Sequence, residues 1–254
     1  MRRVTTLVVA ALLFFSQIGS VAAEPPFLGT RSAIPIDQNR YRFDGGLRFD
    51  QFAVGRQTTA LPFSFVYGLI HNLEVGAHLP YLFAREKTQS RDQLGDVTLL
   101  TKVRFLKGRD AAPISLASVI EIKVPSAPRN AILDTTGEAD VGLSLIASKA
   151  IFPYQAHINL VHTFIGNPPR SERPDRRDYA LGLEYEIDKS DLTLTGEVLG
   201  SVDDALYTND RWLIAGGASL RMPQKITLDS TLGFGLSRRA PDYVFQVRLS
   251  VNYP

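Results

Sequence analysis

The sequence predicts an all-β protein, a transmembrane antiparallel up-and-down β-barrel of about 12 strands that follows a cleaved N-terminal signal peptide. Three observations lead to this prediction. The chain of 254 residues begins with a secretory leader. Apolar and polar side chains then alternate with a period of two along most of the remaining sequence, which is typical of β-strands. Finally, the connections between these segments are alternately short and long, as they are in outer-membrane barrels.

Residues 1–23 have the composition of a secretory signal peptide. Arg2 and Arg3 give a basic start, residues 7–15 form an apolar run, and residues 21–23 fit a small-residue cleavage site. The alternative, a transmembrane helix, needs about 20 apolar residues, and this run is much shorter. The chain has no cysteine, so it offers neither a lipid attachment point nor a disulfide framework.

The charge balance argues against a nucleic-acid partner. The full chain has 28 Lys and Arg residues and 26 Asp and Glu residues. Cleavage of the leader removes two arginines, which leaves equal numbers of basic and acidic residues. A chain without a basic excess lacks the electrostatic footprint of a nucleic-acid-binding domain. The remaining length suits one sizeable domain, which we expect at residues 39–254.

Strand-like alternation starts after an unpatterned, proline-rich stretch at residues 24–38, which we expect to be an extended lead-in. The alternating segments cover residues 41–50, 61–69, 73–81, 96–105, 114–124, 140–150, 156–164, 179–187, 192–198, 211–221, 226–234 and 243–253. One apolar residue from each segment, in chain order, gives Phe43, Leu61, Val75, Leu99, Ile120, Leu143, Ile158, Leu181, Leu194, Ile214, Leu228 and Val247. Segments of about ten residues match a tilted strand that spans a membrane.

The connections between these segments fall into two classes. Short ones lie near residues 70–72, 107–111, 152–154, 188–190 and 222–225, and longer polar ones lie near 51–57, 85–93, 125–138, 166–177, 201–210 and 237–242. Because the two classes alternate, all short turns fall at one end of the barrel. An even number of strands then brings both termini to the short-turn side, which is the periplasmic side in outer-membrane barrels.

The direction of the apolar face separates a membrane barrel from a soluble sandwich, whose apolar face would form the core. Large aromatic residues gather near the ends of the segments. Those near the short turns are Tyr41, Tyr67, Phe105, Phe152, Tyr154 and Tyr253, and those near the long loops are Phe49, Tyr81, Phe164, Tyr179, Trp212, Phe234 and Tyr243. Two aromatic girdles around an aliphatic band are typical of a barrel in lipid. We therefore expect the apolar face to contact lipid and the polar face to line a lumen.

The polar face supplies the candidate lumen-lining residues. They are Arg42, Asp44, Arg48, Glu74, His78, Lys102, Arg104, Glu121, Lys123, His157, Glu184, Glu186, Glu197, Arg211, Arg221 and Arg248. One interpretation is a network of ion pairs that rigidifies the wall. The other is a water-filled passage with a constriction of mixed charge. Both can hold together, and side chains can fill much of a barrel of this size.

Several blocks of the sequence resemble a known family. These are LPFSFVYGLIHNLEVGAHLPYLF, LGDVTLLTKVRFL, DVGLSLIASKA, YALGLEYEID and ITLDSTLGFGLSRRAPDYVFQVRLSVNY. Together they look like the outer-membrane β-barrel transporters of the family named "MetA pathway of phenol degradation". The resemblance implies a twelve-stranded barrel and the passage of small solutes, with aromatic or hydrophobic compounds as candidates. It carries over no catalytic motif. The chain departs from the usual outer-membrane ending because Pro254 follows Tyr253.

Enzymatic and metal chemistry find little support in the sequence. Outer-membrane phospholipases and lipid A deacylases resemble one another in an HxS motif, and the contexts of His71, His78, His157 and His162 do not contain it. A nucleophile needs a base within hydrogen-bond reach, and no spacing suggests one. His162 lies near the outer rim and keeps a lipid-modifying enzyme as an open alternative. His78 and His157 lie on distant segments, so we expect no metal site and no cofactor.

A basic loop follows the segment at residues 156–164. It contains Arg170, Arg173, Arg176 and Arg177. A solvated loop is the simpler interpretation. The alternative is that these guanidinium groups contact the phosphates of the outer-leaflet glycolipid.

The sequence as a whole predicts a porin-like channel or transporter for small solutes in the cell outer membrane, without enzymatic activity. A structural or adhesion barrel without transport is the alternative. The expected partners are the lipid bilayer, the outer-leaflet glycolipid and, during biogenesis, the barrel-assembly machinery. The sequence does not identify the solute.

Overall fold

The computed structural model describes residues 27–53, 55–108, 114–128, 137–166, 173–203 and 210–253. Its strands are β1 (Tyr41–Phe52), β2 (Arg56–Ile70), β3 (Leu73–Glu86), β4 (Gln89–Leu94), β5 (Val97–Leu106), β6 (Ile114–Val124), β7 (Asp140–Ile151), β8 (Tyr154–Phe164), β9 (Arg176–Glu186), β10 (Leu192–Asp203), β11 (Arg211–Met222), β12 (Ile226–Gly235) and β13 (Tyr243–Tyr253). The 3-10 turn η1 (Pro223–Lys225) joins β11 to β12. The predicted signal peptide, residues 1–23, and Pro254 lie outside the described residues. Within the described ranges, no helix has the length and apolarity to span a bilayer.

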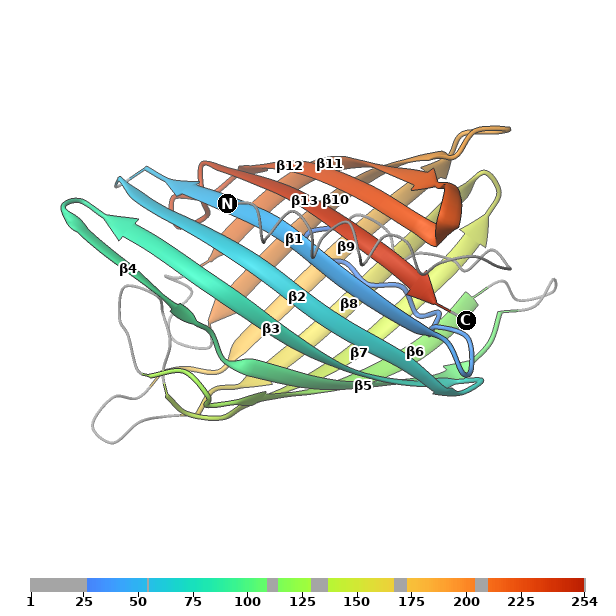
Figure 1. Cartoon of the computed structure of the whole chain (residues 1–254), viewed down its shortest axis with the longest axis horizontal. Coiled ribbons are helices and arrows are strands. Elements are labelled where there is room, and N and C mark those ends of the chain that lie inside the picture. Colours follow the sequence, from blue (N-terminus) through green and yellow to red (C-terminus); the bar gives the residue numbers. More distant parts are fainter. Residues whose placement is uncertain are drawn as a thin grey trace, which may run out of the picture.

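The strands form one closed antiparallel barrel (Figure 1). Apart from β4 and β5, consecutive strands pair with each other, and the first strand β1 pairs with both β2 and the last strand β13. The closing register runs from Tyr41 opposite Tyr253 to Gln51 opposite Tyr243. β4 and β5 both pair with β3, at different heights, so they are two parts of one broken strand. With β4 and β5 counted as one, the barrel therefore has twelve strands, and the predicted fold class is confirmed.

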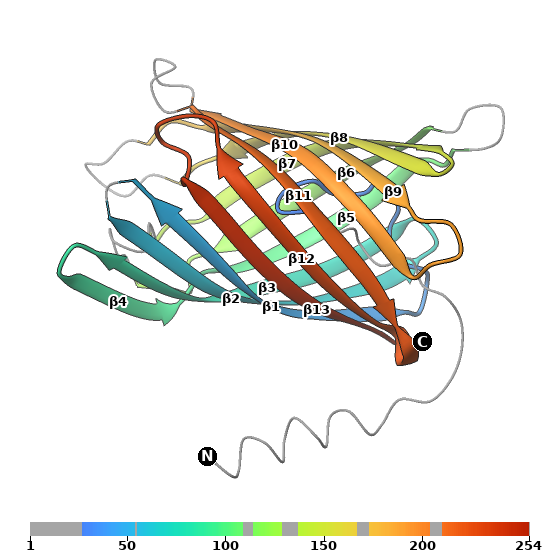
Figure 2. The same ribbon diagram turned by 90° about the horizontal axis from the view of Figure 1, so that it is seen from above.

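Two strands extend much further than the sequence pattern predicted. The predicted loops at 51–57 and 85–93 are largely strand, because β2 has 15 residues and β3 has 14. The β1–β2 ladder continues to Phe52 opposite Arg56, and the β3–β4 ladder to Glu86 opposite Gln89. Figures 1 and 2 both show the β3–β4 hairpin projecting beyond the barrel end. Residues 85–93 are all polar, so the alternation that identifies a half-apolar strand is lost there although the hydrogen-bond ladder continues.

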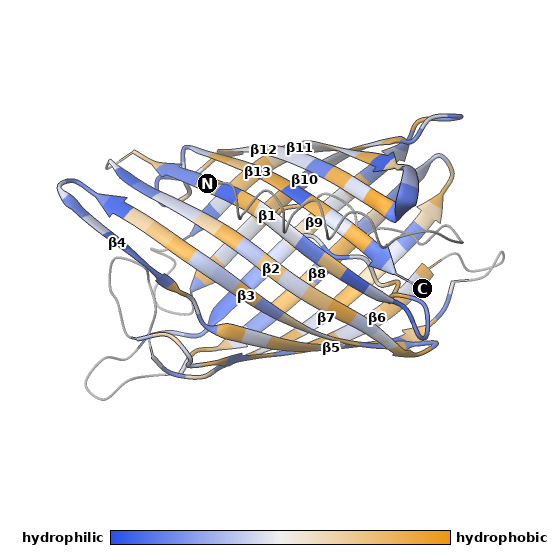
Figure 3. Ribbon diagram, in the orientation of Figure 1, coloured by the Kyte–Doolittle hydropathy of each residue, from blue (hydrophilic) through white to orange (hydrophobic). Residues whose placement is uncertain are grey.

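The barrel has an apolar exterior and a polar interior. Outward-facing Phe63, Leu181 and Phe234 are more than half exposed, at 53%, 55% and 52%. Inward-facing Lys102 and Asp229 are buried. Figure 3 shows the apolar and polar residues alternating along the strands. A soluble sandwich would bury the apolar face instead, so this distribution matches a barrel in lipid.

Aromatic side chains meet in pairs near both ends of the barrel. At the short-turn end, the rings of Tyr41 and Tyr253 stack with centroids 5.1 Å apart across the β1–β13 closure. At the long-loop end, the Phe49 and Tyr243 rings lie 5.9 Å apart across the same two strands. Such rings are favoured where a barrel meets the two membrane interfaces.

Residues 27–38 form an irregular segment that folds into the barrel interior from the short-turn end. We call it the lumen segment. It joins β1 beside the β2–β3 turn, where the amide of Asn39 donates to the Gly68 carbonyl at 2.8 Å. In Figure 2 this part of the chain, in blue, lies within the ring of strands. Of the lead-in expected at residues 24–38, residues 27–38 therefore lie in the interior of the barrel, and residues 24–26 lie outside the described residues.

The face assignment can be tested with two adjacent residues of β10. Leu194 faces outward and is 41% exposed, whereas Thr195 faces the interior. An arginine near the middle of the lipid-facing surface is costly, so Leu194→Arg should lower the free energy of unfolding in detergent or lipid by roughly 2–4 kcal/mol. Thr195→Arg should be tolerated much better. Equal losses in the two variants, measured by denaturant titration and heat-modifiable gel mobility, would show that the assigned faces are wrong.

Candidate functional site

The inner wall carries ion pairs between and along the strands. Lys102 Nζ lies 2.8 Å from Glu74 Oε1, and both side chains are almost fully buried, at 4% and 5% exposed. These two residues face each other across β3 and β5. Further pairs are Arg42–Asp44 at 3.1 Å, Arg48–Asp50 at 3.0 Å, Lys123–Asp140 at 2.6 Å and Arg248–Asp229 at 2.8 Å. Pairing of this kind offsets the cost of taking the charges out of bulk water.

Glu197 of β10 is the main anchor of the lumen segment. Its Oε1 accepts a hydrogen bond from the amide of Leu28. Its Oε2 accepts from the amides of Gly29 at 3.3 Å and Thr30 at 3.1 Å, and from the Thr30 hydroxyl at 2.9 Å. Successive backbone amides that converge on one anion form a concave binding site for negative charge. The segment thus wraps around a buried carboxylate of the wall.

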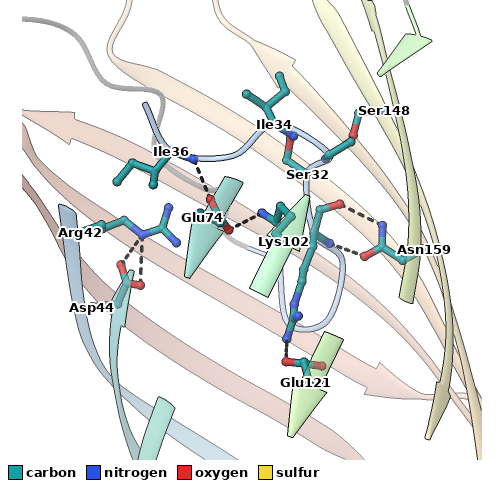
Figure 4. Close-up of polar contacts among 12 residues, drawn as sticks. Ser32, Ile34, Ile36, Arg42, Asp44, Glu74, Lys102, Glu121, Ser148 and Asn159 are labelled. Atoms are coloured by element: carbon teal, nitrogen blue, oxygen red, sulfur yellow. Dashed lines mark hydrogen bonds and ion pairs between the residues drawn. The ribbon is translucent and has the colours of Figure 1, made fainter. Parts of the chain in front are cut away.

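A second anchor pairs the segment with the side chain of Asn159 of β8. The amide of Arg31 donates to Asn159 Oδ1 at 2.6 Å, and Asn159 Nδ2 donates to the Arg31 carbonyl at 2.9 Å. The Arg31 guanidinium donates to Glu121 of β6 at 2.6 Å. Figure 4 shows the contacts with Asn159 and with Glu121. Residue 31 is therefore fixed to β8 through its backbone and to β6 through its side chain.

Two further backbone amides of the segment also find side-chain acceptors. The amide of Ala33 donates to Ser148 Oγ at 2.8 Å, and the amide of Ile36 donates to Glu74 Oε2 at 2.7 Å. Glu74 therefore binds both the segment and Lys102, as Figure 4 shows. Since an unpaired buried amide is costly, these acceptors allow an irregular chain to lie inside the barrel.

Glycines of the wall leave room for the segment where the two come close. A Cβ atom at Gly182 of β9 would lie 2.7 Å from Thr30 Cγ2 and 2.8 Å from the Phe27 ring. A Cβ atom at Gly233 of β12 would lie 3.1 Å from Leu28 Cδ1. The wall is thus shaped to the segment as well as bonded to it.

Ser148, His157 and Glu184 form a hydrogen-bonded chain beside the segment. Ser148 Oγ lies 2.8 Å from His157 Nδ1, and His157 Nε2 lies 2.5 Å from Glu184 Oε1. A serine, a histidine and an acid also form the catalytic chain of many hydrolases. Here Ser148 and His157 are fully buried, and Ser148 already accepts the Ala33 amide. The Phe27 ring also packs edge-on against His157, with centroids 5.7 Å apart. The arrangement serves to hold the segment.

Two cavities remain in the lumen, one on each side of this segment. The larger has a volume of about 610 Å³ and is lined by residues 27–31 of the segment and by strand residues that extend to Asp140 and Arg176 at the long-loop end. The smaller, of about 310 Å³, is lined by Ser32 and residues 34–37 and extends to Glu186 and Arg221 at the short-turn end. Arg42, Glu74 and Lys102 line both cavities. These three side chains, with the segment, form the constriction between them.

Most of the lumen candidates from the sequence lie at these cavities. The larger cavity is lined by Arg42, Asp44, Arg48, Glu74, His78, Lys102, Glu121, Lys123 and Arg248, and the smaller also by Glu184, Glu186 and Arg221. His157 and Glu197 contact the lumen segment instead. Arg104 and Arg211 line neither cavity. Arg104 donates to Asn72 Oδ1 in the β2–β3 turn at 3.0 Å, and Arg211 is exposed at the start of β11.

The arginines proposed for glycolipid contact do not share one environment. Arg170 lies outside the described residues, and Arg173 lies three residues before the start of β9. Arg176 lines the larger cavity and pairs with Asp178 at 3.0 Å, whereas Arg177 is exposed and faces His162 across β8 and β9. Most of the predicted long loop at 125–138 also lies outside the described residues.

Sequence reasoning missed Ser148, Asn159 and Thr30 as functional contacts. A polar residue at an inward-facing position of a strand produces the same sequence alternation whether its side chain contacts water or a buried segment of the chain. The sequence features that could have indicated a buried segment are the uncharged Asn159 and the glycines at inward-facing positions. Among the described residues, no group of three or more His, Cys, Asp or Glu side chains is arranged to hold a metal ion.

No family model and no curated protein matches the sequence. Among solved structures, the COG4313 outer membrane channel from Pseudomonas putida F1 is similar with a TM-score of 0.72 and 13% identity, over 87% of this chain and 98% of that chain. The NanC porin has a TM-score of 0.55 and 13% identity over 84% and 99% of the two chains. The KdgM porin, solved with a disordered oligogalacturonate, has a TM-score of 0.51 and 7% identity over 85% and 98%. At these identities the likeness concerns the fold, which is that of outer-membrane channel barrels.

Glu197→Gln should loosen the lumen segment. The substitution removes the negative charge to which the amides of residues 28–30 donate. A hydrogen bond to a charged group contributes about 1.5–3 kcal/mol. Because about 1.4 kcal/mol corresponds to a factor of ten, amide hydrogen exchange at residues 28–30 should become roughly tenfold faster or more.

Glu186→Gln is the matched control for this experiment, because the Glu186 side chain is exposed at the end of β9. Exchange at residues 28–30 should stay unchanged in that variant. Equal exchange rates in both variants and in the original protein would contradict the role of Glu197 as an anchor.

Proposed function

We propose that the protein is a channel for small solutes in the cell outer membrane. The observation that carries this proposal is the pair of polar cavities that meet at Arg42, Glu74 and Lys102 beside the lumen segment. The apolar exterior suits a bilayer, and the similar solved structures include an outer-membrane channel and two porins. The role is binding and passage, without a catalytic step.

In this proposal the short turns and both termini of the chain face the periplasm, as in outer-membrane barrels with short periplasmic turns. The larger cavity then opens toward the cell exterior and the smaller toward the periplasm. Residues 1–23 would direct export, and the barrel-assembly machinery would insert the protein. Arg173 and Arg177 near the start of β9 are candidates for contact with glycolipid phosphates.

The charges along the proposed path change from one cavity to the other. Acids outnumber bases in the lining of the smaller cavity, where Asp37, Glu74, Glu184, Glu186 and Asp191 oppose Arg42, Lys102 and Arg221. Bases outnumber acids in the lining of the larger one, where Arg31, Arg42, Arg48, Lys102, Lys123, Arg176 and Arg248 oppose Asp44, Glu74, Glu121 and Asp140. The lining charges of a narrow pore set ion preference. Each vestibule should therefore influence selectivity in its own direction.

The solute class follows from the resemblance to the "MetA pathway of phenol degradation" family, which makes aromatic or hydrophobic small molecules the first candidates. A structural barrel without transport is the second candidate function. Its support is the number of buried anchors that hold the lumen segment, because they narrow the lumen. Single-channel recording separates the two, since a structural barrel would not conduct ions.

Deletion of residues 28–36 should widen the passage. This change removes the segment from between the two cavities while the β1–β13 closure stays intact. We expect discrete single-channel currents in the original protein and a several-fold larger conductance in the deletion variant, because conductance rises with pore width. The matched control replaces only Ile34, which is 41% exposed, by alanine. Equal conductance in a folded deletion variant would contradict a path beside the segment.

Selectivity can be tested with exposed charges of the smaller cavity. Glu186→Gln combined with Asp191→Asn should shift the reversal potential in a salt gradient toward anion preference, because two negative charges leave the lining. Arg221→Gln, in the same cavity, should shift it toward cation preference. All three side chains are exposed, so the substitutions should leave folding intact. Identical reversal potentials would exclude this vestibule as a selectivity element.

A further inference from the structure

Inward-facing side chains of β2 and β3 form an apolar patch in the wall of the larger cavity. Ala60 lies opposite Leu82 and Pro62 lies opposite Pro80 in the β2–β3 ladder, and all four residues line the cavity. We call them the apolar floor. Adjacent strands lie about 4.8 Å apart and same-face residues of one strand about 6.8 Å apart, so the floor has roughly the footprint of one six-membered ring. The side chains of Pro62 and Pro80 are closed rings, which keeps this surface rigid.

Arg48 of β1 is the basic residue next to the apolar floor. It lies opposite Ala60 in the β1–β2 ladder, and its side chain is 36% exposed within the lumen. The two oxygens of Asp50 accept hydrogen bonds from Arg48 Nε at 3.0 and 3.2 Å. Within the described part of the chain, these are the hydrogen bonds of this guanidinium group, so both of its Nη groups can donate to a ligand. Their parallel N–H groups match the two oxygens of a carboxylate.

The wall between these arginines and the floor is open because residue 46 is a glycine. Gly46 lies opposite Arg248 of β13, and in the continuing register it lies opposite Pro62 of β2. A Cβ atom at this position would lie 3.6 Å from Pro62 Cγ and only 2.6 Å from the Val247 carbonyl oxygen. A side chain here would therefore cover the edge of the floor. Its absence leaves one continuous surface from Pro62 to the arginines. The strands that form this surface, β13, β1, β2 and β3, lie side by side in Figure 1.

Three arginines line this cavity whereas their acid partners do not. The pairs are Arg48–Asp50, Arg176–Asp178 and Arg248–Asp229. Asp229, for example, is only 1% exposed. The space in front of the guanidinium groups therefore has a positive potential. Because each arginine keeps its acid partner, the excess of positive charge is small. It suits a single carboxylate better than a doubly charged group such as a phosphate ester.

The opposite edge of the floor orients such an anion. The next pair in the β2–β3 ladder, toward the short turns, is Ser64 with His78. The Ser64 hydroxyl donates to Asp44 Oδ2 at 2.7 Å, and Asp44 also lines the cavity. A carboxylate placed at this edge would meet the negative charge of Asp44. The acid group of a ligand should therefore point toward Arg48.

We propose that the larger cavity contains a binding site for small monocarboxylates with a flat apolar body, such as aromatic carboxylates. The carboxylate accepts hydrogen bonds from the Nη groups of Arg48, and the apolar body covers the apolar floor. A neutral aromatic compound lacks the charged contact, and an acidic sugar would place hydroxyl groups on an apolar surface. This inference rests on the proposed function, because the solute reaches the site through the lumen, and it specifies the solute class of the larger cavity.

Equilibrium binding to the full chain, refolded in detergent, tests the site. The probes are benzoate, benzyl alcohol, which has the same ring without the charge, and acetate, which has the same charge without the ring. Each is titrated at neutral pH and followed by ligand-detected NMR, with empty micelles as the blank. Benzoate should bind roughly tenfold or more tightly than either of the others, because a charge-assisted hydrogen bond and a buried ring each contribute at least about that factor.

Each comparison can overturn one part of the proposal. Equal binding of benzoate and benzyl alcohol would show that the charge is not recognised. Equal binding of benzoate and acetate would show a general anion site without a role for the floor. Absence of benzoate binding would overturn the site as a whole.

Substitution of Arg48 tests the charged contact. Arg48→Gln should weaken benzoate binding roughly tenfold and leave the binding of benzyl alcohol unchanged. Arg48→Lys keeps the charge but lacks the pair of parallel donors, so it should restore only part of the affinity. The matched control is Arg211→Gln, because Arg211 is exposed at the start of β11 and lines neither cavity. Equal benzoate affinity in Arg48→Gln and Arg211→Gln would contradict the role of Arg48.

A second variant tests the apolar floor without changing any charge. Leu82→Asn replaces an apolar side chain by a polar one of similar size, at a position that faces the lumen. The preference for benzoate over acetate should then largely disappear, while acetate binding stays the same. Heat-modifiable gel mobility shows that each variant is folded. An unchanged preference in the folded Leu82→Asn protein would contradict the role of the floor.

The binding site and the channel can fail separately, because binding is measured without a membrane. If benzoate binds as described but single-channel recording shows no current, the proposed channel is wrong and the site stands. If the protein conducts ions and Arg48→Gln leaves benzoate binding unchanged, the channel stands and the proposed site is wrong.

Discussion

The structure depends on the need to pair every backbone N–H and C=O group of a chain whose outer surface is apolar. In hydrocarbon, an unpaired backbone group finds no water, so a sheet there must close on itself. The pairing of β1 with β13 provides this closure, from Tyr41–Tyr253 to Gln51–Tyr243. Because side chains alternate along a strand, closure determines which residues of every strand face the lumen and which face outward. The polar face is then confined to a narrow lumen, where charges such as Lys102 and Glu74 must find partners.

The backbone groups of the lumen segment must also be paired, although this segment lies in the interior and not in the wall. An irregular chain inside a barrel cannot pair with a neighbouring strand, so its amides need side-chain acceptors. Glu197, Asn159, Ser148 and Glu74 provide them, one from each of four different strands. The segment converts a barrel that could hold a wide pore into two cavities with one charged constriction. Glu74 belongs both to that constriction and to the anchors, which couples the position of the segment to the charge of the path.

Backbone pairing is incomplete around Pro62 and Pro80. Neither residue has an N–H group to donate, and the β3 ladder changes from β5 to β4 next to Pro80. Both prolines line the larger cavity, where Ala60, Leu82 and Leu100 also make this part of the lining apolar. The constriction at Arg42, Glu74 and Lys102 is charged, so the lumen contains one charged region and one apolar region.

The sequence by itself determined the class of fold, the number of strands and which residues of each strand face the lumen. The reason is that alternation with a period of two is a local property, and twelve segments repeat it. It also placed Arg42, Glu74 and Lys102 on the inner face. Only the tertiary structure decided that residues 27–38 lie inside the barrel and that Glu197 binds the amide of Thr30, 167 residues away in the chain. The physical reason is that alternation reports which side of a strand a residue occupies, whereas the partner it finds there depends on how the closed barrel brings distant segments together.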